Sequence, residues 1–217
     1  MRLPLTLWVG FLLGVMAAAT YAQGSPRKIA GDVVWFRSGV LEIRTTSGEH
    51  VRIELTDRTR ISKRAASDLS QVRQGSFIGT TAAPRADGTL VASEVHIFSE
   101  AMRGTGEGHR PMAGNNTMTN ATVTSISSGG AARNTMTNAT VANVADSNGA
   151  RRLTLTYKGG HNVVVVPSGT PVTTIDVGEP SLLVPGAHVI VYAANHRDGS
   201  LTAERVSVGK NGYVPAL

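Results

Sequence analysis

The sequence feature that most constrains the fold is an internal repeat. Residues 53–97, shifted by 111 positions, align with residues 164–208 without a gap. The shift places Asp87 and Gly88 on Asp198 and Gly199, and it keeps the spacing of the apolar residues although most side chains differ. A fixed period of this kind is typical of one structural unit used twice. We therefore expect two modules of the same fold.

In the first module, apolar residues at every second position alternate with polar ones, between turns that contain Gly and Ser. This alternation is typical of half-buried antiparallel strands. The expected strands span residues 31–36, 40–45, 51–55, 76–83 and 90–98. Residues 59–61 should leave the third strand, and Asp68 should cap a single helical turn that ends at Gly75. Three strands, a short helical connection and a hairpin follow the order of an OB-type barrel.

The second module repeats this order. Its expected strands span residues 141–144, 152–157, 162–166, 188–194 and 201–208, with an irregular crossing at 177–183. We predict an all-β chain with two tandem, small, OB-like, five-stranded antiparallel barrels joined by a Gly-rich linker. The predicted first module spans residues 27–98, the linker 99–133 and the second module 134–217.

The linker contains a shorter repeat of its own. The octapeptide NTMTNATV occurs at 116–123 and again at 134–141, 18 residues later. Because both copies offer the same alternating side chains, strand register is weakly specified here. We expect the second copy to open the second module and the first copy to form an added strand beside it.

The linker is too charged for a flexible spacer, which would be rich in Ser and Gly without such charges. We expect residues 99–114 to form an ordered loop packed between the barrels. In that loop Glu100 or Glu107 should pair with an arginine, and Met102 or Met112 should be at least partly buried.

The N-terminus has the pattern of a signal peptide. Arg2 is followed by an apolar run over residues 3–19, and the small residue Ala22 ends the segment. We expect cleavage after Ala22, which predicts a periplasmic or secreted protein with no membrane span in the mature chain. The sequence has no cysteine, so its cores must hold without disulfides even in an oxidising compartment.

The pattern of turn and core residues in the two modules resembles an exported bacterial family of small OB-like barrel modules, which often occur in tandem and form a domain of unknown function; the second module departs from the pattern at the position of Asp68 and Leu69. The resemblance implies the fold and assigns no activity or site residue. It rests on turn and core positions: Thr59, Ile61, Asp68, Leu69, Gly75, Asp87, Gly88, Leu90, Ala92 and Val95, and in the second module Thr170, Val172, Gly186, Asp198, Gly199, Leu201, Ala203 and Val206.

The residues predict no catalysis. No serine lies in a nucleophile-elbow sequence, no paired carboxylates stand out, and there is no thiol. We therefore predict that the protein is not an enzyme and has neither catalytic residues nor a cofactor.

Charge points instead to binding. The chain carries a formal net charge of +6, which suits an anionic surface or polymer.

The binding face expected for an OB-type barrel has aromatic residues and arginines, which hold extended polymers. Because neighbouring residues of a strand point to opposite faces, either Trp35 or Phe36 must point outward. We predict a binding or adaptor protein for an unknown envelope protein or an anionic polymer, and we expect no nucleic acid because the chain is exported. The predicted anionic-ligand surface comprises Arg44, Arg52, Arg58, Arg60, Lys63 and Arg64.

Two other functions stay open. Imidazole, carboxylate and thioether groups suit Cu or Zn outside the cytoplasm, so the chain could handle metal through His109, Glu107 and Met112 of the linker with nearby His96, although their spacing matches no known metal motif. The remaining alternative is a structural component of the envelope.

Overall fold

The computed structural model describes residues 26–86, 89–128 and 149–215. In these ranges the chain is all-β, as predicted, and its helical parts are short 3₁₀ turns. No helix there is long and apolar enough to cross a membrane. The elements are β1 (Arg27–Arg37), β2 (Val40–Thr45), β3 (His50–Ser67), η1 (Leu69–Gln71), β4 (Phe77–Pro84), β5 (Leu90–Phe98), η2 (Glu100–Met102), β6 (Gly108–Pro111), β7 (Thr117–Ser128), β8 (Arg151–Tyr157), β9 (Gly160–Val166), β10 (Val172–Val177), η3 (Pro180–Leu182), β11 (His188–Asn195) and β12 (Leu201–Gly209).

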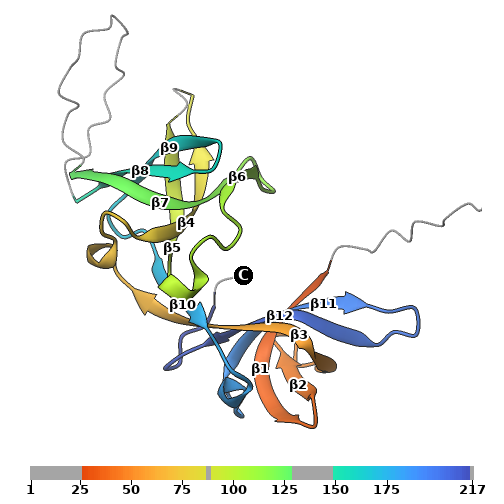
Figure 1. The fold of residues 1–217 in the computed structure, drawn as a ribbon. Helices are drawn as coiled ribbons and strands as arrows, with labels where there is room; N and C mark the ends of the chain where they lie inside the picture. The colour runs from red at the N-terminus through yellow and green to blue at the C-terminus, as the bar shows by residue number, and fades with distance from the viewer. Residues whose placement is uncertain (1–25, 87–88, 129–148, 216–217) are drawn as a thin grey trace, which may run out of the picture.

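Five strands from the two ends of the chain close into a barrel, which we call the first barrel. Strands β1, β2 and β3 pair antiparallel, β12 pairs parallel with β3, and β11 pairs antiparallel with both β12 and β1. Figure 1 shows the N-terminal and C-terminal strands side by side. Alternate residues of all five strands fill the interior, and the fully enclosed ones include Leu41, Ile43, Ile53, Val191 and Val206.

A second group of five strands, the second ring, lies beside the first barrel. Its pairings run from β5 through β4, β7, β8 and β9, and they return to β5 through two parallel residue pairs. Strand β6 adds to β7, while β10 lies between β5 and β3 and joins the two groups. The second core includes Ile78, Val95, Val123, Leu153 and Leu155.

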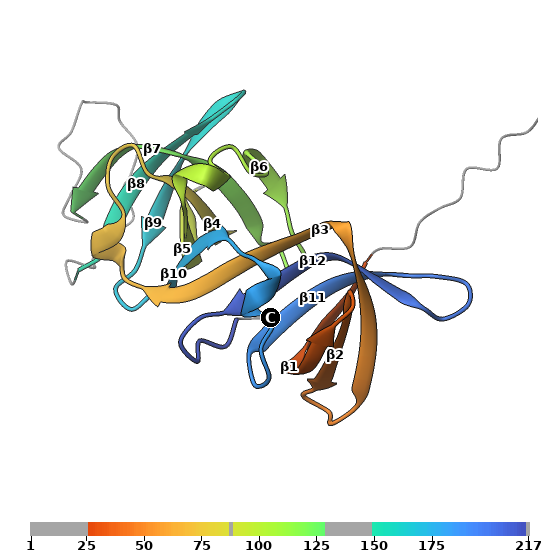
Figure 2. The ribbon, with the colours of Figure 1, turned by 60° about the horizontal axis from the view of Figure 1, so that its bottom comes forward.

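The expected tandem arrangement does not match these pairings. The first barrel takes β1 to β3 from the first predicted module and the hairpin β11–β12 from the second. The second ring takes the hairpin β4–β5 from the first module, β7 from the predicted linker, and β8 and β9 from the second module. The cause is the length of β3. It was expected to end near Leu55, but after an irregular stretch it continues to Ser67. Apart from residues 56–59, its residues up to Arg64 stay paired with β2 or β12 of the first barrel, and its second half also pairs with β10, which leads to the second ring (Figure 2).

The two exchanged hairpins match each other residue by residue. In β4 and β5 the register shifts between Thr81 and Ala82, and in β11 and β12 it shifts between Tyr192 and Ala193, which is the same place after a shift of 111. The helical turns η1 and η3 also coincide under that shift. As predicted, Asp68 caps η1 and accepts a hydrogen bond from the Ser70 amide. Asp87 and Gly88 lie outside the described residues, so their predicted turn stays a prediction.

The first octapeptide, 116–123, forms part of a central strand rather than an added one. It runs into β7, which pairs with β4 on one side and with β8 and β6 on the other. Ala121 and Val123 are completely buried in the second core. The expectation for this copy is therefore wrong, and part of the predicted linker belongs to the ring. The second copy, 134–141, lies outside the described residues.

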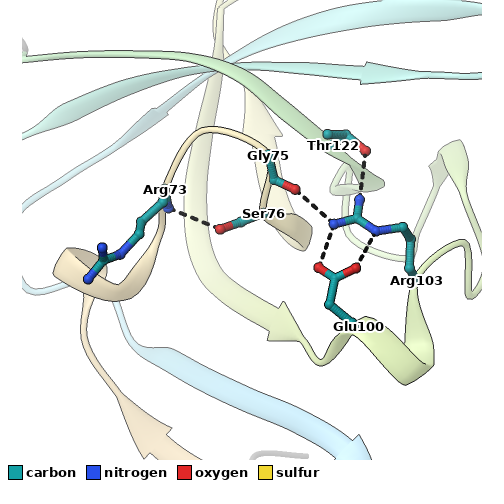
Figure 3. Close-up of polar contacts among 6 residues, drawn as sticks. All are labelled: Arg73, Gly75, Ser76, Glu100, Arg103 and Thr122. Atoms are coloured by element: carbon teal, nitrogen blue, oxygen red, sulfur yellow. Dashed lines mark hydrogen bonds and ion pairs between the residues drawn. The ribbon is translucent and has the colours of Figure 1, made fainter.

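The loop after β5 is ordered, as expected. The Arg103 guanidinium donates to both carboxylate oxygens of Glu100, at 2.7 and 2.6 Å, and to the Gly75 carbonyl at 2.9 Å (Figure 3). Met102 is half-buried, whereas Met112 is exposed. Because Gly75 precedes β4, these bonds fasten the loop to the second ring.

The exchange of hairpins can be tested with a disulfide, since the chain has no cysteine of its own. Ser62 and Ser207 are partners in the β3–β12 pairing, with their hydroxyl oxygens 3.2 Å apart. We expect the double variant Ser62→Cys, Ser207→Cys to oxidise to an intramolecular disulfide, which peptide mass mapping would detect. In a tandem arrangement the neighbour of Ser62 would be His96, so the control pair Ser62→Cys, His96→Cys should stay reduced. A disulfide in the control alone would disprove the exchange.

The octapeptide repeat leads to a deletion test. All side chains of 116–123 have identical counterparts in 134–141. Deleting residues 116–133 should therefore leave a chain that still folds, because the second copy can supply the same contacts to β4 and the first two residue pairs with β8. We expect one cooperative thermal transition for this variant. The control carries the same deletion with residues 134–141 scrambled and should not unfold cooperatively. Loss of cooperativity in the simple deletion would contradict the interchangeability of the copies.

Candidate functional site

The six basic residues of the predicted anionic-ligand surface differ in their surroundings in the structure. Three of them are in ion pairs: Arg44 with Asp32 at 3.6 Å, Arg52 with Glu42 at 2.8 Å, and Lys63 with Asp176 at 3.0 Å. Arg64 is half-buried, and its Nε has no hydrogen-bond partner. Only Arg58 and Arg60 are exposed without an ion pair to a described residue.

One of the paired arginines, Arg52, lies beside the ring of Trp35. As predicted, one of the two neighbouring aromatic residues points outward. Phe36 packs against the first core, while the Trp35 ring has the Arg37 guanidinium 4.6 Å and the Arg52 guanidinium 5.8 Å from its centroid. Glu42 holds this group in place. Hydrogen bonds from His50 and Arg52 lower the pKa of its carboxyl.

A different set of cations lies in a line across four strands of the first barrel. Arg60 of β3 is the register partner of Arg205 of β12, Arg205 is the partner of Tyr192 of β11, and Tyr192 is the partner of Lys28 of β1. Residues paired in this way share one face of a sheet, and this face is the outer one because Ile29, Val191 and Val206 fill the interior. We call Arg60, Arg205, Tyr192 and Lys28 the cationic row.

The cations of the row form no short ion pair, although Glu94 of β5 interacts electrostatically with Lys28. None of its three cations forms an ion pair with a described carboxylate within 4.0 Å. The Arg205 guanidinium lies 4.4 Å from the centroid of the Tyr192 ring. Like charges directly opposite each other on neighbouring strands destabilise a sheet. Arg60 and Arg205 therefore set two like charges on neighbouring strands of the exposed face, where an anionic ligand can meet both.

The corresponding positions of the second ring carry no such row. Under the shift of 111, the counterparts of Arg60, Arg205 and Tyr192 are Pro171, Glu94 and Thr81. The place of Lys28 is taken by Met118, which is the register partner of Thr81. The excess of basic over acidic residues is also larger in the first barrel than in the second ring. Residues 27–67 and 178–217, which include the first barrel, contain 12 Lys or Arg and 8 Asp or Glu, whereas residues 68–177 contain 8 and 7.

A cleft of about 550 Å³ opens at the Arg60 end of the row. Between the pairs Leu55–Ala203 and Arg60–Arg205, four residues of β3 (56–59) face a single residue of β12, Glu204. The extra residues of β3 bulge outward and leave the space. Its lining comprises Thr56, Asp57, Arg58, Arg60, Thr202, Ala203 and Glu204.

Thr59 holds the bulge in shape. Its hydroxyl donates to the Ala203 carbonyl at 2.7 Å and accepts from the Thr56 amide at 2.9 Å, and the Thr56 hydroxyl accepts from the Arg58 amide at 3.3 Å. These bonds tie the bulge both to itself and to β12. The cleft is therefore formed before any ligand arrives.

The residues of the metal hypothesis have separate partners. His109 Nδ1 lies 2.9 Å from both the Thr119 hydroxyl and the Asn162 amide nitrogen, and Glu107 accepts from the Lys158 amide at 3.0 Å. His96 Nδ1 bonds the Thr173 hydroxyl at 2.8 Å, and Met112 is exposed. The described residues contain no group of three or more His, Cys, Asp or Glu side chains that could hold a metal ion. The metal hypothesis therefore gains no geometric support and stays a prediction from the sequence.

His96 is buried where β5 pairs with β10. Burial, together with the positive charge of Arg64, lowers its pKa from 6.5 to about 4. Its Nε2 lies 3.5 Å from a carboxylate oxygen of Glu94, whose own pKa is raised by burial. His96 is thus held neutral in the folded protein at neutral pH.

This setting predicts a loss of stability in acid. The unfolded chain binds a proton at His96 near pH 6.5, whereas the folded chain does so only near pH 4. The free energy of unfolding should therefore fall across this window, by an amount of the order of 3 kcal/mol from His96 alone. The raised pKa of Glu94 acts in the opposite direction. We expect His96→Asn to flatten the acid limb of stability measured by urea unfolding, and the exposed control His161→Asn to leave it unchanged. An unchanged slope in His96→Asn would contradict the assignment.

Sequence reasoning found two members of this site, Arg58 and Arg60, and missed Arg205, Tyr192 and Lys28. Comparison of the chain with protein-family models, curated proteins and solved structures found no match to any of them. The resemblance stated from the repeated residues therefore stays a prediction, and the function must be argued from the geometry alone.

Proposed function

We propose that the protein is a non-enzymatic, periplasmic or secreted binding protein, in which two OB-like barrels with exchanged hairpins present a site for an extended anionic ligand. The ligand lies along the cationic row of the first barrel, with one end in the adjoining cleft. The observation that carries this proposal is the direct pairing of Arg60 with Arg205, exposed and without a neutralising carboxylate.

Several features support an extended ligand over a small ion. The row crosses four neighbouring strands, and since strands lie about 4.8 Å apart, it spans about 14 Å. Lys28 and Arg205 flank Tyr192, whose ring supplies an apolar contact between the charges. A positive groove with an aromatic platform is the usual means of holding a charged polymer. The exported location follows from the N-terminal segment and rests on the sequence.

The proposal predicts that one substitution weakens binding and raises stability together. In Arg205→Glu the new carboxylate would face Arg60, as Glu94 would do in a tandem arrangement. We expect affinity for linear polyphosphate, measured by calorimetry at low salt, to fall about tenfold or more, because a cation is replaced by an anion. The melting temperature should rise slightly, because a like-charge pair becomes an attractive one.

The matched control is Arg152→Glu on β8, which makes the same change in net charge at an exposed position of the second ring. It should leave the affinity within about twofold of the original value, because it lies outside the row and changes only the long-range field, which salt screens. Equal losses of affinity in both variants would show that the effect depends only on net charge. Failure of the unmodified protein to bind either linear polyphosphate or a polyuronate would refute the proposal.

A further inference from the structure

We infer that the ligand of the cleft is an acidic polysaccharide, a polymer that carries carboxylates and free hydroxyl groups on the same chain. This inference rests on the proposed function and adds the chemical class of the ligand. It comes from the acidic residues of the cleft, which a site built only for negative charge would lack.

The cleft presents both signs of charge. Arg58 and Arg60 offer guanidinium donors, while Asp57 and Glu204 offer carboxylate acceptors. All four side chains belong to exposed residues, and none of the four forms an ion pair with another described residue. A ligand that satisfies the cleft must therefore bring anionic groups for the arginines and hydrogen-bond donors for the carboxylates.

This requirement separates the classes of polyanion. Polyphosphate has acceptor oxygens and no donors along its chain, so it would satisfy the arginines and be repelled by Asp57 and Glu204. A neutral polysaccharide would satisfy the carboxylates and leave the Arg60–Arg205 repulsion in place. A polyuronate supplies carboxylates to the arginines and hydroxyl donors to the acids, so it matches both halves of the lining.

The size and form of the site agree with a saccharide chain. A volume of about 550 Å³ falls in the range of sites that enclose small organic molecules, so the cleft can seat a short stretch of a sugar polymer. The remaining chain would follow the row to Tyr192, whose ring combines an apolar face with a hydroxyl. Because Thr59 already fixes the bulge, little conformational entropy is lost when the ligand binds.

The second ring provides an internal comparison. The positions that correspond to Asp57, Arg58 and Glu204 are Ser168, Gly169 and Ser93. Thr170, the counterpart of Thr59, still bonds within its turn, donating to the Pro167 carbonyl at 2.9 Å. At the place of the bulge the second ring thus has a turn between β9 and β10, and its residues there are uncharged. The charged lining is therefore not required for the chain to leave the strand at this place.

The test measures calorimetric affinities of the full-length protein for polygalacturonate and for linear polyphosphate at equal ionic strength. Two double variants isolate the carboxylates. Asp57→Asn with Glu204→Gln removes the charges and keeps an acceptor oxygen on each side chain, whereas Asp57→Ala with Glu204→Ala removes both. Thermal unfolding checks that each variant is folded, which we expect because both residues are exposed.

We expect the unmodified protein to bind polygalacturonate more tightly than polyphosphate. The Ala pair should bind polygalacturonate about tenfold more weakly than the amide pair, because it has lost the acceptors for ligand hydroxyls. Both pairs should bind polyphosphate alike and more tightly than the original protein does. Equal affinities of the two pairs for polygalacturonate would overturn the inference and leave the proposed function standing. Failure of the unmodified protein to bind either polymer would overturn both.

Discussion

The parallel pairing of β12 with β3 is the contact on which the rest of the structure depends. It closes the first barrel, and it does so with a hairpin that the sequence places more than 130 residues after β3 begins. The same contact sets Arg205 against Arg60 and opens the cleft where residues 56–59 pass Glu204. Core, site and connectivity are therefore consequences of one strand pair. Closure also leaves the first barrel without a free sheet edge, which would otherwise be a template for aggregation.

Local structure could be read from the sequence because it depends on neighbours along the chain. Alternating apolar residues marked β2, β4 and β5 to within a residue or two, and Asp68 marked η1. The connectivity could not be read in the same way. The hairpins β4–β5 and β11–β12 share their apolar spacing and their bulge, so either would fit the interior of either ring. What decides between them is the extension of β3 to Ser67, whereas the sequence predicts that residues 59–61 leave the strand.

The candidate site shows a similar division. Arg58 and Arg60 stood out as a local cluster, whereas Arg44, Arg52 and Lys63 could not be set apart from them because their carboxylate partners lie on other strands. Arg205 and Lys28 were missed because they lie near opposite ends of the chain and only the exchanged hairpin brings them together. One signal was present: Glu94 and Arg205 occupy equivalent positions with opposite charge. In a repeat, such a reversal of charge indicates a position at which the two copies differ in function.

That reversal also explains why the two rings can differ in function while sharing one architecture. In a tandem arrangement Glu94 would face Arg60, and an attractive pair would add to stability at no structural expense. The exchange puts Arg205 there instead, so the first barrel keeps a repulsive contact on its surface while its interior and the long β3 strand supply the compensating stability. A local conflict that the rest of the fold tolerates is the expected sign of a binding surface. The second ring fastens the far half of β3 through β10, and its Glu94 interacts electrostatically with Lys28 at the end of the row.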